Sequence, residues 1–337
     1  MDPSPEASRG AEARLVDRLR ARTGGDGPVS FAEYMDVALF DAEVGYYAAR
    51  RARVGKGGST DFYTATTFAG VFAPLVVAAA ERLVGGAEAA KSHAWVEIGA
   101  EPERALLDGV AHPFAGAACV RLGEAGGIPA RAVVFSNELF DAQPFHRLIW
   151  RAGAWREMGV AWRSGPLAWT ELPALSGELA PVAGRLPVSS EDGYTLDLPW
   201  RAVRLLEKIA APGWRGLFLA FDYGRTWQQI AEEYPQGTGR AYLAHRQSGD
   251  LLALPGNQDL TCHVCWDWLE EALRRAGFQT VRRESQEAFF VKHAAAAIEN
   301  LVQREPNPMA PARSQLKHLL HPALMGHRFE ALWGLRA

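Results

Sequence analysis

The strongest chemical signal in the sequence is the segment WVEIGA at residues 95–100, an apolar run that ends in an acid, Glu97, and a glycine, Gly99. Ligands of open parallel sheets bind beyond the carboxyl ends of the strands, and a glycine there lets the backbone approach a cofactor closely. The segment therefore indicates a cofactor site, although an acid and a glycine also follow many strands by chance.

Two further apolar runs are followed by polar side chains that we expect at the same edge of a sheet. They are Asn137, Glu138 and Asp141 after residues 131–135, and Asp222 and Tyr223 after residues 216–221. Glu138 could hold a guanidinium or an amine through charge-assisted hydrogen bonds. The alternative is that Asn137 or Asp141 caps a helix.

Cys262 and Cys265 form a C-x-x-C pair. Such a pair could be redox-active or supply half of a zinc site. Cys119 is the only other cysteine in the sequence, and no second pair or thioredoxin-like context accompanies it. We therefore favour two small buried residues, no metal site and a reducing compartment. A thiol redox protein built on this pair is the less favoured alternative.

The composition is that of a globular protein, with 48% hydrophobic and 22% charged residues among 337. It excludes a disordered tail, a collagen-like chain and a coiled coil. A formal charge of −3, from 36 basic and 39 acidic residues, creates no field for gripping nucleic acid or an anionic membrane. The N-terminus lacks the apolar centre of a secretion signal, and no apolar stretch reaches the ~20 residues of a membrane span. We expect a soluble, cytoplasmic protein that binds neither membranes nor nucleic acid.

The elements that must position these side chains fall into three predicted regions. They are a flexible arm with one helix over residues 1–28, a helical cap over 29–92, and a Rossmann-like α/β domain over 93–337. In the cap, Ser30 and Glu33 have the spacing of a capping box. In the domain, nearly continuous apolar runs at 94–98, 131–135 and 216–221 are typical of parallel strands buried on both faces and covered by helices.

The rest of the domain is less regular. A hairpin formed by residues 145–150 and 155–161 is predicted within an insertion at about 144–200. Two short apolar segments, 278–282 and 288–291, predict an antiparallel finish to the sheet.

Six motifs along the chain resemble those of one family. In order they are DVALFDAEVGYY at 36–47 with TDFYTA at 60–65, SNELFDAQP at 136–144, FDYG at 221–224, GTGRAYLAH at 237–245, PGNQDLTCHV at 255–264 and HPALMGHRFEAL at 321–332. They are similar to the motifs of the MidA-like S-adenosylmethionine-dependent methyltransferases, a family that includes the mitochondrial complex I assembly methyltransferase. Six motifs in the family's order are far more specific than any one of them.

The resemblance implies a seven-stranded methyltransferase sheet with S-adenosylmethionine in the cleft at its carboxyl end. It also implies a homodimer and, for the mitochondrial member, methylation of protein arginine. Asp61, Phe62 and Thr64 match the family's loop over the cofactor; the alternative is that Phe62 packs and Thr64 caps the next helix. The residues that could line the substrate channel are His245, Asp259, Thr261 and His263, although a lone histidine is usually structural.

The cofactor loop departs from the family pattern, which has an acid, a hydrophobic residue and then G-x-G-x-G. Here Glu101 and Glu103 occupy the second and third glycine positions. A Cβ obstructs backbone approach to a ligand, and two carboxylates would repel the methionyl carboxylate of the cofactor. The same residues suit the start of a helix, with Pro102 in its first turn. As a cofactor loop, the segment is damaged.

The stretch before Ser136 is also short. An acid at the end of the second strand of this fold usually holds the ribose, and here the only strand-like run is 117–122, followed by Glu124. Either Glu124 is the ribose acid and the next βα unit is nearly gone, or that unit has replaced the acid-bearing strand. We expect a sheet that lacks one βα unit.

The leading hypothesis is a methyltransferase that acts on a protein side chain, arginine by resemblance. Methyl transfer is an in-line displacement, so the chain must position the nucleophile and stabilise its charge. The alternative is a catalytically silent homologue that binds a protein substrate or assembly partner, because both departures affect the cofactor site. The candidate catalytic residues are Glu138, Asp141, Asp222 and His245, and the candidate cofactor-binding residues are Asp61, Phe62, Thr64, Glu97, Gly99, Glu124 and Asn137.

Overall fold

The computed structural model describes residues 5–48, 68–100, 105–121, 127–162, 166–188, 190–211, 213–243 and 246–337. The chain divides into two compact units, each built from separate stretches of sequence. Unit 1 comprises Met1–Phe62, Asp141–Arg204 and Arg225–Asp267, and unit 2 comprises Tyr63–Phe140, Leu205–Gly224 and Trp268–Ala337. These boundaries differ from the predicted arm, cap and domain, although the middle stretch of unit 1 lies close to the insertion predicted at about 144–200.

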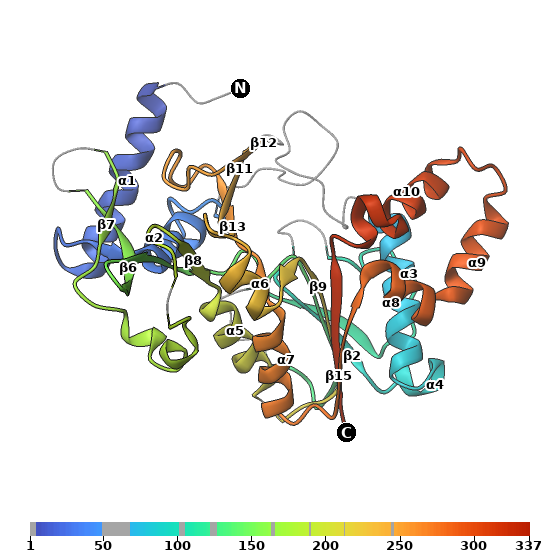
Figure 1. The fold of residues 1–337 in the computed structure, drawn as a ribbon. Helices are drawn as coiled ribbons and strands as arrows, with labels where there is room; N and C mark the ends of the chain where they lie inside the picture. Colours follow the sequence, from blue (N-terminus) through green and yellow to red (C-terminus); the bar gives the residue numbers. More distant parts are fainter. Residues whose placement is uncertain are drawn as a thin grey trace. The chain divides into compact units, whose positions relative to one another are not determined.

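Unit 2 is built around a six-stranded sheet in the order β15-β16-β9-β4-β2-β3 (Figure 1). β9, β4, β2 and β3 run parallel, and β16 runs antiparallel to both of its neighbours. The prediction of a Rossmann-like sheet with an antiparallel end is thus confirmed. The strands are β2 (Ala94–Ile98), β3 (Gly116–Val120), β4 (Arg131–Asn137), β9 (Arg215–Asp222), β15 (Thr280–Ser285) and β16 (Glu330–Arg336).

Aromatic packing from two helices covers one face of this sheet. Phe72 of α3 and Phe290 of α8 each pack on Phe221 of β9, with ring centroids 5.3 Å apart in both pairs. All three rings are fully buried, which explains why β9 reads as a continuous apolar run. The helices of unit 2 are α3 (Ala69–Leu83), α4 (Ala87–Ala90), α8 (Gln286–His293), α9 (Ala295–Arg304), α10 (Pro311–Leu320) and the short turn η4 (Pro322–Gly326), with most of α5 (Trp200–Ala210) and α7 (Trp266–Arg275).

The last predicted strand is wrong. Residues 288–291 lie in α8, and the strand that pairs with β15 is β16 near the C-terminus. The side chain of Ser285 caps α8 by accepting a hydrogen bond from the backbone N–H of Ala288. Phe289 and Phe290 are both buried. A short apolar run fits a buried helix as well as a strand, so the pattern alone does not separate the two.

In the described residues the sheet lacks one βα unit, in agreement with the short spacing. Among the described strands only β3 lies beyond β2, and only residues 121–130 connect β3 to β4. The helix expected directly after the cofactor loop is not found in residues 105–115, which form turns and bends. The sheet is therefore reduced on the side where the predicted ribose acid, Glu124, would follow β3.

Unit 1 contains an antiparallel sheet in the order β1-β6-β5-β8, with β7 paired to β6, and a second sheet in the order β12-β11-β13. The strands are β1 (Val29–Ser30), β5 (His146–Arg151), β6 (Ala154–Ala161), β7 (Ala168–Glu171), β8 (Thr195–Leu198), β11 (Arg240–Leu243), β12 (Arg246–Ser248), β13 (Asp259–Thr261) and β14 (Val264–Cys265), and the short β10 (Gly224–Arg225) contains a unit boundary. The helices are α1 (Pro5–Thr23), α2 (Phe31–Phe40), α6 (Trp227–Glu232) and the short η2 (Gly177–Leu179) and η3 (Ala183–Arg185).

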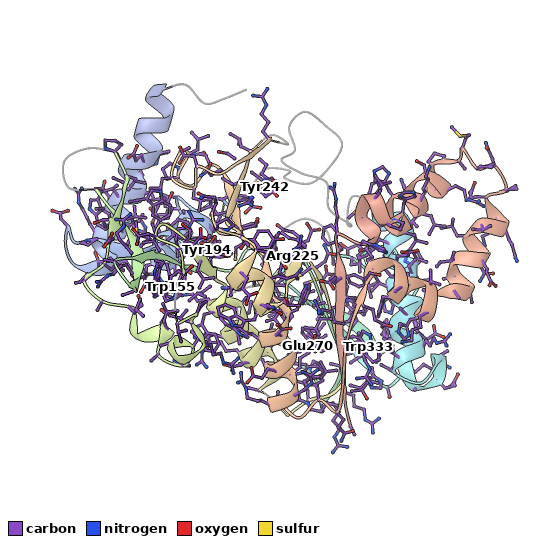
Figure 2. The ribbon with its side chains drawn as sticks, viewed as in Figure 1. Trp155, Tyr194, Arg225, Tyr242, Glu270 and Trp333 are labelled. Atoms are coloured by element: carbon purple, nitrogen blue, oxygen red, sulfur yellow. The ribbon has the colours of Figure 1, made fainter. Side chains whose placement is uncertain are left out.

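Two local predictions in unit 1 are confirmed. β5 and β6 form the predicted hairpin through Ala152 and Gly153, whose φ angles of 50° and 77° are those of a type I′ turn. Trp155 on β6 packs against Tyr194, with ring centroids 6.4 Å apart (Figure 2). At the start of α2, the backbone N–H of Glu33 donates to the side chain of Ser30, and the backbone N–H of Ser30 donates to the side chain of Glu33. This is the predicted capping box.

The N-terminal helix is packed rather than free. Leu15 and Leu19 of α1 are fully buried in the same apolar cluster as Phe31 of α2. Arg18 Nε lies 2.9 Å from Asp41 Oδ2, in an ion pair that ties α1 to the turn after α2. The predicted flexible arm is therefore part of the core of unit 1 at these positions. None of the helices in the described residues is both long and apolar enough to cross a membrane.

Candidate functional site

Glu97 is the penultimate residue of β2, and its carboxylate lies in the interior. The side chain is 5% exposed, and its Oε2 accepts a hydrogen bond of 2.7 Å from the backbone N–H of Leu106. Burial raises the pKa of Glu97 to about 7, and the charge of Asp108 also raises it, whereas the Leu106 hydrogen bond lowers it. Glu97 is thus close to half-protonated at neutral pH.

Gly99 follows in a conformation that suits glycine. Its φ is +75°, and a Cβ at this position would lie 2.6 Å from Leu139 Cδ1. Its backbone N–H donates to the carbonyl of Val120, which ties the turn after β2 to the end of β3. The turn after β2 and the turn after β4 therefore meet closely, and a Cβ at Gly99 would require the Leu139 side chain to move.

The turn after β4 holds the strongest strain of the site. Glu138 has a φ of +50°, in the left-handed region that a residue with a Cβ seldom adopts. Its backbone N–H donates to the carbonyl of Phe221, and its Oε1 accepts a 2.9 Å hydrogen bond from Asn137 Nδ2. The other amide atom, Asn137 Oδ1, is buried without a hydrogen-bond partner in the described part of the chain. Strain and an orphaned acceptor at one turn are features of binding sites.

Asp222 ends β9 beside this turn and is fully buried. Its Oδ2 accepts a 2.9 Å hydrogen bond from the backbone N–H of Phe140, and its Oδ1 accepts one of 2.9 Å from the backbone N–H of Tyr223. β4 and β9 pair in a register that sets Asn137 beside Phe221, so the ends of the two strands lie together. Five predicted residues therefore gather at one edge of the unit 2 sheet: Glu97, Gly99, Asn137, Glu138 and Asp222.

Asp141, Asp259, Thr261 and His263, which were also predicted from the sequence, belong to unit 1. Tyr47, from the GYY motif, donates its hydroxyl to Asp259 Oδ1 over 2.9 Å, so two motifs 212 residues apart meet. Burial, followed by the charges of Asp259, Tyr46 and Asp141, raises the pKa of Tyr47 well above its usual value. Thr261 shares a face of β13 with Asp259 because side chains alternate along a strand. The predicted catalytic Asp141 lies in this unit and accepts a backbone hydrogen bond from Cys262.

His263 is the one described histidine among the predicted channel residues. Its backbone N–H donates to Thr238 Oγ1, and its ring packs edge-on against Tyr234. Burial lowers the pKa of His263 to about 4, and the charges of Arg225 and Arg240 contribute to this shift. The imidazole is therefore neutral at pH 7 and can accept a proton only well below it.

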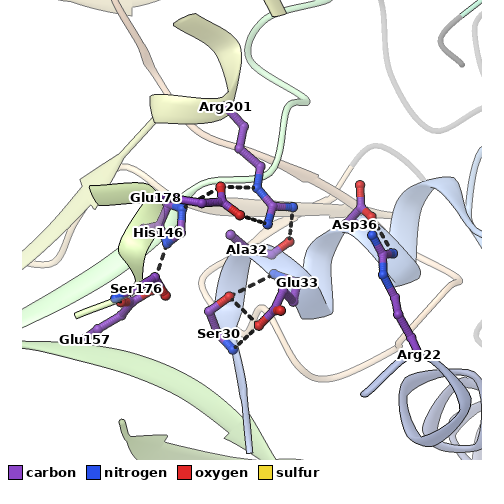
Figure 3. A network of polar contacts seen from close by, with 10 residues as sticks. All are labelled: Arg22, Ser30, Ala32, Glu33, Asp36, His146, Glu157, Ser176, Glu178 and Arg201. Atoms are coloured by element: carbon purple, nitrogen blue, oxygen red, sulfur yellow. Dashed lines mark hydrogen bonds and ion pairs between the residues drawn. The ribbon is translucent and has the colours of Figure 1, made fainter. Parts of the chain in front are cut away.

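Sequence reasoning missed a buried polar network in unit 1 (Figure 3). His146 Nδ1 lies 2.7 Å from Glu157 Oε1, and its Nε2 lies 3.4 Å from Glu178 Oε2; the side chains of His146 and Glu157 are fully buried. Glu178 pairs with Arg201 through two hydrogen bonds of 2.9 and 2.7 Å. Burial by itself lowers the pKa of His146, but the two glutamates outweigh it and raise the pKa overall.

A second network explains the glycines of the GTGRAY motif. Arg147 binds the fully buried carboxylate of Asp197 through hydrogen bonds of 2.8 and 3.0 Å. The backbone N–H of Gly239 donates to the same carboxylate over 2.7 Å. A Cβ on Gly237, whose φ is +73°, would lie 2.3 Å from Asp197 Oδ2. These glycines therefore let the backbone pass a buried ion pair, which is a structural role.

The remaining candidates divide into two groups. Cys262 and Cys265 are buried free cysteines, as favoured from the sequence, and no group of metal-ligating side chains occurs among the described residues. Eight residues named in the sequence analysis lie outside the described residues: Asp61, Phe62, Thr64, Glu101, Pro102, Glu103, Glu124 and His245.

Comparisons with known proteins agree on one family. A family model described as "Putative S-adenosyl-L-methionine-dependent methyltransferase" matches residues 120–283. A solved structure from Burkholderia thailandensis, of a "likely methyl transferase" bound to S-adenosyl-homocysteine, is 25% identical, with a TM-score of 0.83 over 100% of this chain and 95% of that chain. A native structure of an uncharacterised superfamily protein from the same organism is 24% identical, with a TM-score of 0.80 over 100% and 95% of the two chains. No curated protein matches the chain.

These matches confirm the resemblance to MidA-like S-adenosylmethionine-dependent methyltransferases and the Rossmann-like methyltransferase fold. The family model begins in β3 and ends in β15, so it includes β4 and β9 but not the cofactor loop. The structural match covers 100% of this chain.

Proposed function

We propose that this chain, a member of that methyltransferase family by its motifs and fold, binds S-adenosylmethionine at the carboxyl ends of β2, β4 and β9 and transfers its methyl group. One observation carries the proposal: Asn137 Oδ1 is buried at this edge without a hydrogen-bond partner in the described residues. A buried unpaired acceptor costs free energy that a ligand with N–H or O–H donors would recover. S-adenosylmethionine carries such donors on its ammonium, ribose and adenine groups.

Neighbouring residues fit the same ligand. The turn at Gly99 offers backbone to a cofactor, and Glu97, with a pKa near 7, carries only part of a negative charge toward it. The solved relative bound to S-adenosyl-homocysteine supports this choice of cofactor. When bound, the cofactor supplies a methyl group on a positively charged sulfur. The residues of this edge would then orient the cofactor and the nucleophile in line.

The methyl acceptor that we propose is a protein side chain, arginine by family resemblance, in a cytoplasmic homodimer. Glu138 lies at the carboxyl edge, where its carboxylate would hold a guanidinium through charge-assisted hydrogen bonds. Its strained backbone supports a functional role, since such strain persists where a geometry is needed. Asp141 and His245 remain predicted catalytic residues from the same resemblance.

Titration calorimetry with S-adenosylmethionine and with S-adenosylhomocysteine tests the proposal. We expect a dissociation constant of roughly 1–100 μM, which corresponds to about −8 to −5.5 kcal/mol. Asn137→Ala should weaken binding about tenfold, because one hydrogen bond to the ligand is lost. Asn300→Ala, at an exposed position of α9, is the matched control and should bind as the wild type does. Absence of heat and of any thermal shift at millimolar ligand would refute the proposal.

A second candidate function is a catalytically silent homologue that serves as a binding or assembly module. Two observations favour it: Glu101 and Glu103 replace two glycines of the cofactor loop, and residues 105–115 form no helix after it. Under this alternative the wild type binds no cofactor, and the double variant Glu101→Gly with Glu103→Gly restores binding. Binding by the wild type with no gain in the double variant would exclude it.

A further inference from the structure

The turn that follows β4, residues 138–140, adopts a conformation that its own sequence does not favour. Glu138 carries a Cβ and still has a φ of +50°. Residues in this region persist only when surrounding contacts fix them. The contacts that fix Glu138 should therefore be found at the end of a neighbouring strand.

Two hydrogen bonds join this turn to the end of β9, and a third lies within the end of β9 itself. The backbone N–H of Glu138 donates to the carbonyl of Phe221 over 2.9 Å. The next residue, Asp222, accepts from the backbone N–H of Phe140 with one oxygen and from its neighbour Tyr223 with the other, each over 2.9 Å. One oxygen of the Asp222 carboxylate thus holds Phe140, at the far side of the turn. The hydrogen bond from Tyr223 to the other oxygen fixes the orientation of the carboxylate.

We propose that Asp222 is a positioning residue rather than a catalytic one. Its carboxylate holds the turn 138–140 against β9, keeps Glu138 left-handed and so aims Asn137 Oδ1 at the cofactor. The inference rests on the proposed cofactor site and assigns to Asp222 an indirect role, exerted through Asn137. Because Asp222 is fully buried and bound by two backbone N–H groups, it is poorly placed to meet a substrate but well placed to set a backbone.

Asp222→Asn tests this role with little change in shape. An amide accepts with one atom and donates with the other, so it would present an N–H to one of the two backbone N–H groups. We expect the affinity for S-adenosylhomocysteine, measured by calorimetry, to fall about tenfold. In the Asn137→Ala background the same substitution should cause no further loss, because its effect passes through Asn137. If the two losses multiply instead, Asp222 acts independently of Asn137 and the inference fails.

A second measurement separates this inference from the proposed function. The chain has four asparagines, at 137, 257, 300 and 307, so selective ¹⁵N-asparagine labelling gives few side-chain amide signals. Asn137→Ala identifies the Asn137 pair. Without any ligand, Asp222→Asn should move this pair. The matched control is Asp192→Asn, which alters an exposed carboxylate that accepts the backbone N–H of Ala152; it should leave the Asn137 pair in place. An unmoved Asn137 signal in Asp222→Asn overturns the inference, whether or not the wild type binds the cofactor.

Discussion

Carboxylates in the two units have opposite environments. Glu97 in unit 2 is buried beside another acid, Asp108, and burial raises its pKa to about 7. Glu178 in unit 1 is half exposed and bound by His146 and Arg201, which hold its pKa well below the usual range. An acid poised near neutral pH at a sheet edge is a functional candidate, whereas acids in ion-pair networks are commonly structural. The same chemical group therefore stabilises unit 1 and is held at an energetic cost in unit 2.

Breaking an ion pair of unit 1 should have the largest effect. Arg147→Met leaves the fully buried carboxylate of Asp197 without its cation, and such a change costs about 3–5 kcal/mol of unfolding free energy. Urea denaturation at pH 7 measures it. The double variant Arg147→Met with Asp197→Leu should recover much of the loss, because no charge remains buried. A loss below about 1 kcal/mol in the single variant would mean that this pair is not a main support of unit 1.

Neutralising Glu97 should raise the free energy of unfolding rather than lower it. Since its folded pKa is raised from 4.5 to about 7, its contribution to stability is fully present below pH 4.5 and is lost as the pH rises through 7. Glu97→Gln removes that loss, so at pH 8 it should be more stable than the wild type by about 3 kcal/mol. At pH 4.5 the two proteins should be nearly equal. Urea curves at both pH values measure the difference.

Glu191→Gln is the matched control for this prediction, because Glu191 is an exposed acid. It should leave the free energy of unfolding nearly unchanged at pH 8 and at pH 4.5. A Glu97→Gln protein that is less stable than the wild type at pH 8 would mean that the carboxylate is stabilised as an ion, and the contrast between the two units would disappear.

The sequence predicts which residues gather at this site better than it predicts their local geometry and pKa values. Glu97, Asn137 and Asp222 gather because the carboxyl ends of parallel strands lie at one edge of a sheet, and each strand is visible as an apolar run. The left-handed turn at Glu138 could not be predicted, since it depends on hydrogen bonds from β9 and no glycine marks it. The raised pKa of Glu97 depends first on its burial and then on Leu106 and Asp108, turn residues that stand where the sequence predicts a helix.

Long-range networks were beyond sequence reasoning for a related reason. His146 and Glu157 meet because β5 and β6 pair in one register, and neither residue carries a local signal of its partner. Residues 288–291 show that local patterns can also be ambiguous. This apolar run fits a strand or a helix, and in the structure it lies in a helix that Ser285 caps. By contrast, Ala152-Gly153 and the Ser30–Glu33 pair were predictable because turns and caps depend on neighbours in sequence.

The His146 network should show a pH dependence in unit 1. The raised pKa of His146 means that its stabilisation is fully present below about pH 6.5 and is lost as the pH rises through the folded pKa. His146→Gln should cost about 1–3 kcal/mol at pH 6, because Glu157 loses its charged partner, and less at pH 9. Urea curves in the Glu97→Gln background isolate this effect. A cost that is equal at both pH values would mean that His146 stabilises unit 1 as a neutral ring.

The smallest stability changes that we predict concern two glycines, one in each unit. A Cβ on Gly99 meets only the flexible end of Leu139, whereas one on Gly237 meets a carboxylate that Arg147 holds in place. Gly99→Ala should therefore cost little beyond its positive φ, about 1 kcal/mol, and Gly237→Ala should cost more. Thermal or urea denaturation ranks the two variants. Gly99→Ala should still weaken S-adenosylhomocysteine binding, because Leu139 must move within the turn that directly follows Asn137. If Gly99→Ala lost more stability than Gly237→Ala, the more rigid packing would lie in unit 2 and the contrast between the units would be reversed.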